Sequence, residues 1–188
     1  MSALEAFRRR RSHPRVTADA PSHAELLPLV EAAATVADHG SLRPWRLIEL
    51  RGDARRRLGE AFVAASGLTG HDAESLAAKP LRASLLIAVV VKEVPSIKVS
   101  AWEQEAAASG VAHALSLLLD EAGWGVMWRT GGHVRSAEVR AMHGLAANEK
   151  LLGWLYVGGV EERDRAESAR REKNTKFIAD EFITELTA

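Results

Sequence analysis

The sequence predicts an α+β fold, in which roughly four strands and several helices follow one another in an irregular order. The unbroken aliphatic and β-branched run Leu85–Val91 is typical of a strand that is buried on both faces. The alanine-rich stretch from Ala101 to Ala122 is the longest with helical spacing. Because strands and helices do not alternate strictly, this order argues against a doubly wound α/β sheet.

The boundaries of the elements follow from capping residues and breakers. Ser22 and Glu25 have the spacing of a capping box, Pro14 stops the first helix, and Gly123 supplies the C-cap of the long one. The predicted helices are 2–12, 22–37, 53–66, 72–79, 101–122 and 136–142, and the predicted strands are 46–50, 85–91, 126–129 and 151–157.

We expect one domain that spans residues 1–188, because the chain shows no internal repeat and no interdomain linker. Residues 161–188 form its charged C-terminal arm, in which apolar residues return only from Phe177. The charged segment 161–176 is long for a loop inside a compact domain, which favours an arm that finishes on a partner subunit.

The composition excludes several classes of function. Lys+Arg and Asp+Glu are both 25, and this neutral balance argues against nucleic acid or an acidic membrane as the main partner. The absence of cysteine excludes disulfides and a cysteine nucleophile. The longest apolar run is too short to span a bilayer, and the N-terminus lacks the pattern of a signal peptide, so we expect a cytoplasmic protein.

The sequence also lacks the common catalytic motifs. It contains no GxxxxGK[ST], no HExxH, no GxSxG and no GxGxxG after a strand, and no two histidines stand at metal-ligand spacing. The sequence therefore shows none of the residue patterns that hydrolytic, kinase-like or metal-centred mechanisms require. A redox enzyme whose chemistry belongs to a bound organic cofactor needs none of these motifs.

Three segments could bind such a cofactor, and each has a plainer alternative. Arg10-Arg11-Ser12 can hold a phosphate or be a solvated basic helix end. The loop 38–46, with Pro44-Trp45, can cover a flat aromatic ligand or be a helix C-cap followed by a packed tryptophan. The glycine-flanked stretch 123–132 can bring backbone N–H groups close to a ligand or contain ordinary turn glycines.

Together and in order, these motifs resemble the minimal members of the nitroreductase family, which are short FMN enzymes. The resemblance runs from about Ala3 to Gly158 and rests on four motifs: Arg10-Arg11-Ser12, Asp38-His39 followed by Pro44-Trp45-Arg46, Trp102-Glu103-Gln104-Glu105, and Gly123-x-Gly125-x-x-Trp128-Arg129-Thr130-Gly131. Two positions depart from the family pattern. Thr35 stands where close members carry arginine, and Ala37 stands where proline is usual.

The resemblance implies a mixed, mainly antiparallel sheet wrapped by helices, and a homodimer with two FMN sites at its interface. Arg10, Arg11 and Ser12 would bind the FMN phosphate and ribityl chain, while Thr35 and His39 would border the flavin from the opposite subunit. Trp128, Arg129 and Thr130 would face the isoalloxazine ring. The nicotinamide cofactor NAD(P)H would lie near Leu118, Leu119, Asp120, Glu121, Ala122 and Gly123.

The activity implied is ping-pong hydride transfer from NAD(P)H through flavin N5 to a nitroaromatic, a quinone or a related small acceptor. No side chain need act as a nucleophile, because the flavin carries the chemistry. Arg129 is the candidate for positive charge near the N1/O2 edge of the flavin, and a surface ion pair is its alternative. His39 would donate a proton or only position the loop.

Two other classes of function remain open at this point. A non-catalytic protein that binds or senses FMN is the first, and Thr35 together with the altered loop favours it. A binding module that uses the basic run Arg8–Arg11 is the second, against which the zero net charge counts.

Overall fold

The computed structural model describes residues 2–162 and 177–186, and it contains one four-stranded antiparallel sheet. The strands lie in the order β1-β2-β4-β3. Each neighbouring pair is antiparallel, which confirms the predicted α+β class and the mainly antiparallel sheet. The strand bounds are β1 Trp45–Leu50, β2 Leu85–Lys92, β3 Gly125–Arg129 and β4 Glu149–Gly158.

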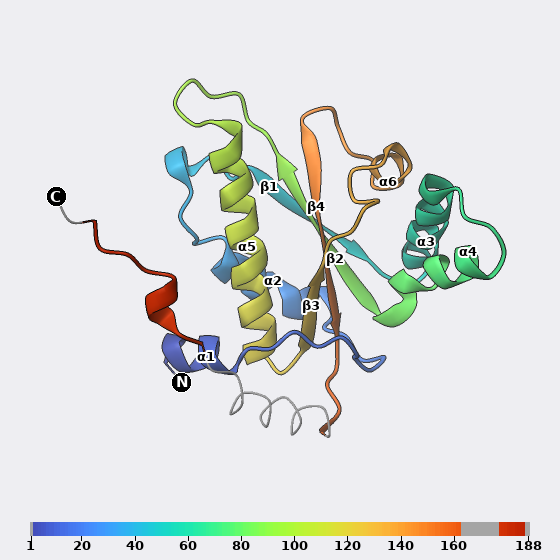
Figure 1. Cartoon of the computed structure of the whole chain (residues 1–188), viewed down its shortest axis with the longest axis horizontal. Coiled ribbons are helices and arrows are strands. Elements are labelled where there is room, and N and C mark those ends of the chain that lie inside the picture. The colour runs from blue at the N-terminus through green and yellow to red at the C-terminus, as the bar shows by residue number, and fades with distance from the viewer. Residues whose placement is uncertain (1, 163–176, 187–188) are drawn as a thin grey trace.

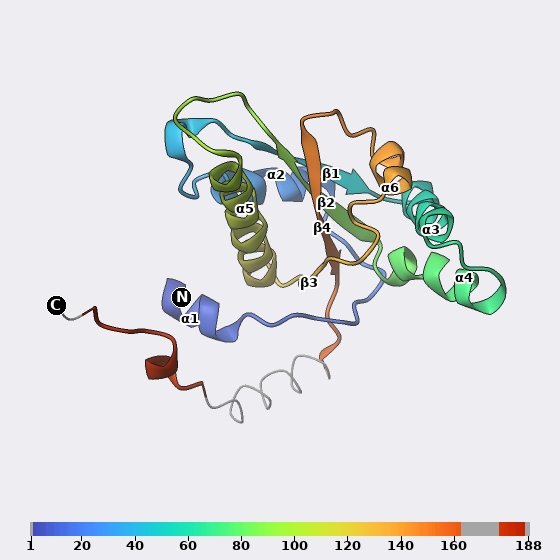
Figure 2. The same cartoon turned by 45° about the horizontal axis from the view of Figure 1, so that its top comes forward.

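Helices cover both faces of this sheet (Figures 1 and 2). One face packs against α2 and α5, and the other packs against α3, α4 and α6. The α-helices are α1 Ala3–Arg9, α2 His23–Ala33, α3 Asp53–Ser66, α4 Gly70–Ala77, α5 Ala101–Glu121 and α6 Ala137–Met142. The shorter 3-10 helices are η1 His39–Ser41, η2 Lys79–Arg82 and η3 Ala179–Glu181.

Strand β2 explains why the sheet needs two covering layers. Ile87 and Val89 point toward α2 and α5, while Leu86 and Ala88 point toward the α3 side, and all four are buried. Successive residues of a strand face opposite sides, so a run that is apolar throughout needs a core on each face. The prediction of a strand buried on both faces is therefore confirmed.

Most predicted elements are present, and the differences lie at their ends. Helix α2 stops at Ala33 rather than at Ala37. The Thr35 hydroxyl donates a hydrogen bond of 2.8 Å to the carbonyl oxygen of Ala32, which gives the chain a local turn in place of another helical turn. Helix α4 begins at Gly70 and ends at Ala77, and the chain from Lys79 to Arg82 tightens into η2 around the buried Pro80.

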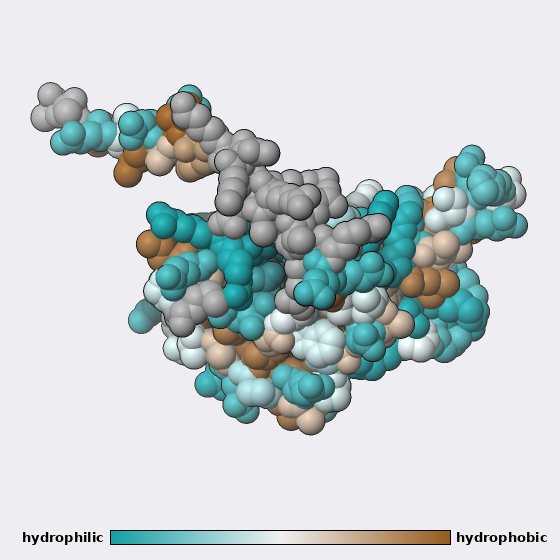
Figure 3. Space-filling model, turned by 90° about the horizontal axis from the view of Figure 1, so that it is seen from below, coloured by the Kyte–Doolittle hydropathy of each residue, from teal (hydrophilic) through white to brown (hydrophobic). Residues whose placement is uncertain are grey.

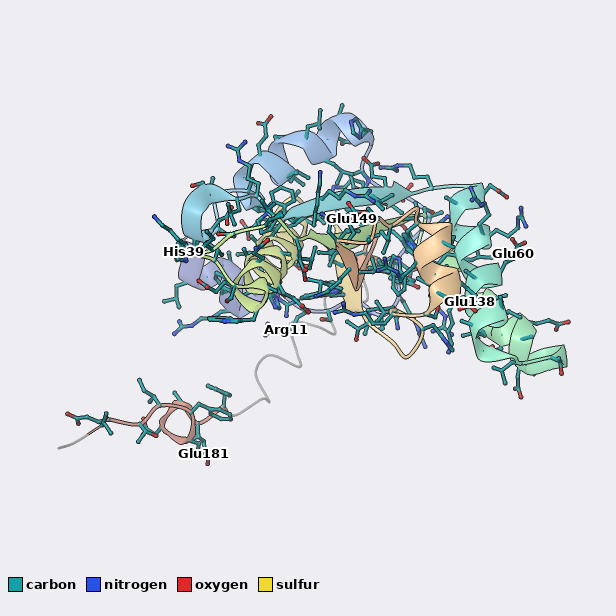
Figure 4. The ribbon with its side chains drawn as sticks, turned by 90° about the horizontal axis from the view of Figure 1, so that it is seen from above. Arg11, His39, Glu60, Glu138, Glu149 and Glu181 are labelled. Carbon is teal, nitrogen blue, oxygen red and sulfur yellow. The ribbon has the colours of Figure 1, made fainter. Side chains whose placement is uncertain are left out.

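The described residues that follow β4 form no further strand. Residues 177–186 contain η3 and lie apart from the helices and the sheet (Figures 3 and 4). Their apolar side chains are exposed, and the rings of Phe177 and Phe182 stack on each other with centroids 4.8 Å apart. Residues 163–176 and 187–188 of the predicted arm lie outside the described residues, so the extent of the arm stays a prediction.

Candidate functional site

The segment after α1 fixes the Arg10-Arg11-Ser12 motif against the edge of the sheet. The backbone N–H of His13 donates to Val126 of β3 (2.9 Å), and that of Thr17 donates to Gly159 just after β4 (2.8 Å). Arg9 forms ion pairs with Glu121 and, at 3.9 Å, with Asp120 at the end of α5. The motif therefore lies where α5 ends and β3 begins.

The three motif residues differ in their local contacts. Arg10 is the C-cap residue of α1, and its N–H donates to the carbonyl of Ala6. Arg11 donates to the carbonyl of Arg8 (2.5 Å) and to its neighbour's carbonyl (2.8 Å). Ser12 is exposed. The Ser12 hydroxyl is thus accessible beside two partly exposed arginines, and such donors suit a helix end as well as a bound phosphate.

The residues of β3 divide between the two faces of the sheet. Trp128 points toward α5, where its ring meets the His113 ring edge-on with centroids 5.1 Å apart. Arg129 points to the other face, where its guanidinium lies 5.1 Å above the centre of the Tyr156 ring. Arg129 Nη2 also donates to the carbonyl of Pro14 at 3.3 Å. The side chain thus joins β3 to the N-terminal segment.

Arg129 Nε and Trp128 Nε1 are buried, and neither has a hydrogen-bond partner among the described residues. Buried N–H groups are nearly always paired in folded proteins, so each of these groups requires an explanation. For Arg129, a ligand that accepts a hydrogen bond beside β3 would provide one.

Gly153 of β4 determines how closely β3 can approach, although none of the predicted motifs includes it. It pairs with Val89 next to a bulge whose extra residue is Leu152, and its φ is 131°. A Cβ atom there would lie 2.5 Å from the Arg129 carbonyl oxygen and 2.9 Å from Trp128 Nε1. A glycine inside the apolar run Leu151–Val157 was the available indication, because such a glycine often marks a bulge or a close backbone approach.

A hollow of about 560 Å³ opens beside β3 on the Arg129 face. Phe62 of α3, Leu76 of α4 and the rings of Trp154 and Tyr156 form its apolar walls. A second lobe of about 530 Å³ shares Arg82, Met127 and Arg129 with the first and continues to Pro14–Val16. The cavity therefore connects the end of β3 with the segment that follows the Arg10-Arg11-Ser12 motif.

His39 lies beside the other end of α5, and Thr35 precedes Val36, which packs against Gly110 in the middle of that helix. His39 Nδ1 is 2.8 Å from Glu103 Oε2, in the first turn of that helix. The His39 hydrogen bond, with further hydrogen bonds from Ser100, lowers the pKa of Glu103 to about 2. Thr35 is exposed at the turn that follows α2, with its hydroxyl bound to the backbone.

One protomer does not bring the two halves of the predicted flavin site together. Glu103 beside His39 and Glu121 beside Arg9 are separated by about 27 Å along α5, at 1.5 Å per residue. Figure 1 shows α1 at the lower end of α5, and Figure 4 labels Arg11 and His39, which come from separate segments. The two halves can meet only if a second protomer supplies one of them.

The predicted nicotinamide segment forms the end of α5 and the turn after it. Leu119 is fully buried and Leu118 packs against the same core. Asp120 lies 3.7 Å from His13 and, like Glu121, pairs with Arg9, while Ala122 caps the helix and Gly123 turns the chain with a φ of 90°. These contacts hold the N-terminal segment in place, and a nicotinamide role for the segment stays a prediction.

Residues 2–162 and 177–186 contain neither a candidate metal centre nor a candidate membrane span. No group of three or more His, Asp or Glu side chains in these ranges could hold a metal ion. No helix in them is long and apolar enough to cross a membrane.

Comparison with known proteins relates both the sequence and the fold to one family. Residues 7–159 match the sequence profile described as "Nitroreductase family". The chain is 32% identical over 161 residues to YdjA of Escherichia coli (strain K12), which is named as a proposed NAD(P)H nitroreductase, with 84% of this chain and 88% of that protein covered.

Two crystal structures share the fold at lower sequence identity. One is a nitroreductase-like family protein from Bacillus cereus, with a TM-score of 0.80 and 21% identity over 100% of this chain and 97% of that chain. The other is the FMN- and NADPH-dependent nitroreductase NfnB from Sphigopyxis sp. strain HMH, with a TM-score of 0.75 and 20% identity over 100% of both chains.

Proposed function

Because this chain belongs to the nitroreductase family, we propose that it is an FMN-dependent oxidoreductase that takes hydride from NAD(P)H. The observation that carries the FMN assignment is the two-lobed hollow between Arg129 and the N-terminal segment. The named activities of YdjA and NfnB agree with it.

The residues around the hollow fit FMN in shape and charge. Aromatic walls suit a flat ring system, and the buried, unpaired Nε of Arg129 lacks an acceptor that a flavin oxygen would supply. The second lobe leads toward Arg10 and Ser12, which offer donors for a phosphate. FMN with its ring in the first lobe and its phosphorylated tail along the second would give acceptors both to Arg129 and to the donors of Arg10 and Ser12.

Each predicted residue would then contact a defined part of FMN. Arg10, Arg11 and Ser12 would hold the phosphate and the ribityl chain, while Trp128, Arg129 and Thr130 would fix the ring against the end of β3. FMN bound there would supply the chemistry, accepting hydride at N5 from NAD(P)H and passing it to a nitroaromatic, quinone or related acceptor in a ping-pong cycle. The chain itself would contribute binding, orientation and charge.

A homodimer would complete the site with Thr35 and His39 of the second subunit. Trp102, Ala106 and His113 recur at helical spacing on α5 and are exposed, Trp102 by 72%. A two-fold axis perpendicular to this face would run the two α5 helices antiparallel. The beginning of one α5, beside His39, would then lie near the end of the other, beside Arg9.

Binding of FMN to the purified protein tests this proposal. We expect one FMN per subunit, measured by quenching of flavin fluorescence and by release of FMN on denaturation. A protein that binds no FMN at micromolar concentration would contradict the proposal, and salt-sensitive binding of DNA would then favour the basic-helix module. A protein that binds FMN but does not turn over would be the non-catalytic alternative.

A further inference from the structure

The hollow beside β3 is lined by an excess of positive charge. Arg15, Lys79, Arg82 and Arg129 line its two lobes, and none of its described lining residues is a carboxylate. This local excess contrasts with the zero net charge of the whole chain. Like charges around one cavity repel one another unless an anion lies between them, so the lining favours a negatively charged ligand.

Arg82 and Arg129 are the two cations that both lobes share. They reach the cavity from different elements, Arg82 from η2 and Arg129 from β3. Burial raises the pKa of Tyr156 to about 12, and the charges of Arg129 and Arg82 both oppose this rise. Both guanidinium groups are therefore close enough to act on the same wall of the first lobe.

Within the described part of the chain, the Arg82 side chain makes no polar contact that would stabilise the fold. Its side chain is exposed and makes no hydrogen bond or ion pair with any described residue. Arg129, in contrast, is tied to the Pro14 carbonyl and to the Tyr156 ring. A fixed cation thus shares the hollow with a cation that can approach a ligand.

We propose that Arg82 is a cofactor-binding residue that, across the hollow from Arg129, stabilises the negative charge which reduction places on the isoalloxazine ring of FMN. The inference rests on the proposed function. A hydride delivers two electrons and one proton, and it therefore leaves one negative charge on a neutral acceptor ring. Two guanidinium groups facing that ring bind the charged form more tightly than the neutral form, which raises the reduction potential of bound FMN.

The test compares Arg82→Gln with Arg57→Gln, which removes the same charge from an exposed position on α3 outside the hollow. For each variant, the affinity for oxidised FMN and the midpoint potential of bound FMN are measured without oxygen against reference dyes. We expect Arg82→Gln to lose about tenfold more affinity for reduced than for oxidised FMN, which lowers the two-electron potential by about 30 mV.

We expect Arg57→Gln to keep the wild-type midpoint potential. We expect Arg82→Lys to have a midpoint potential close to that of the wild type. All three variants are expected to keep the wild-type melting temperature. An unchanged potential in Arg82→Gln, with FMN still bound, would overturn the role of Arg82 and leave the proposed function intact. A wild-type protein that binds no FMN would overturn both.

Discussion

The Glu149 carboxylate shows how single residues hold this fold together. It is buried at the start of β4, where Arg46 of β1 donates hydrogen bonds of 2.6 and 2.8 Å to its two oxygens. The backbone N–H of Ala146 adds a third hydrogen bond of 3.0 Å. Since Arg46 and Glu149 stand on strands that flank β2, the pair joins β1 to β4 across it.

Replacing Glu149 with Gln should lower the free energy of unfolding by about 2 kcal/mol, because the charge-assisted hydrogen bonds of the buried carboxylate are lost while Arg46, whose side chain is 37% exposed, stays partly solvated. The matched change Glu60→Gln, in the exposed pair with Arg56, should cost about 0.5 kcal/mol or less. Figure 4 shows Glu149 inside the fold and Glu60 at its edge. Urea unfolding of both variants measures the difference, and equal losses would contradict the assigned role of the buried pair.

The same pair predicts how stability depends on pH. Mainly through the hydrogen bonds from Arg46, the pKa of Glu149 falls from 4.5 to about 2. A carboxyl whose pKa is lower in the folded state contributes stability above its unfolded pKa. This contribution should therefore be present above pH 4.5 and be lost as the pH falls toward about 2. The loss over this range should be smaller in Glu149→Gln than in the wild type, because Glu103, whose pKa is also about 2, still contributes to it in both proteins.

Arg10 and Ser12 test the phosphate assignment at the residue scale. Removal of one charge-assisted hydrogen bond should weaken FMN binding about tenfold in Arg10→Ala or Ser12→Ala. The control Arg57→Ala should bind FMN like the wild type, and all variants should keep the folded state by circular dichroism. Wild-type affinity in both motif variants would show that the phosphate binds elsewhere.

At the scale of elements, capping boxes and strand patterns are local, so the sequence predicts them well. Ser22 with Glu25 begins α2, and Leu85–Val91 lies within β2, as expected. The bulge at Leu152 depends on β2 and the close approach at Gly153 depends on β3, so no pattern within β4 alone fixes them. The early end of α2 likewise depends on a side-chain hydrogen bond of Thr35.

Gly153→Ala should destabilise the pairing of β3 with β4. The new Cβ would lie 2.5 Å from a backbone oxygen, and the φ of 131° disfavours side chains. A loss of about 2 kcal/mol or more in unfolding free energy is expected from the strain. Gly132→Ala, where nothing lies within 4 Å of the added Cβ, is the nearby control and should change stability little. Equal melting temperatures for the two variants would argue against this role of Gly153.

At the scale of the whole molecule, the motifs alone predict the residue types of the site but not its shape. Phe62, Arg82 and Arg129 meet at one hollow although they are distant in sequence. Their meeting follows from the strand order and from helices packed on both faces, which local patterns do not encode. The separation of His39 from Arg11 by the length of α5 is equally a property of the tertiary fold.

Ala106→Glu should disrupt the proposed dimer, because it places a carboxylate in the exposed face of α5. Sedimentation at micromolar concentration is expected to show a monomer, and FMN affinity is expected to fall with it since each site would lose Thr35 and His39 of the second subunit. Ala24→Glu, at an exposed position of α2, is the control and should stay dimeric. A dimer that survives Ala106→Glu would place the interface on another face.

The reaction of the FMN-loaded protein with NADPH and NADH in the absence of oxygen tests the central claim most directly. The account predicts that at least one nucleotide bleaches the flavin absorbance at one equivalent per subunit, and that a nitroaromatic or a quinone restores the colour. Bleaching no faster than that of free FMN under the same conditions would contradict an oxidoreductase and leave a protein that only binds the flavin.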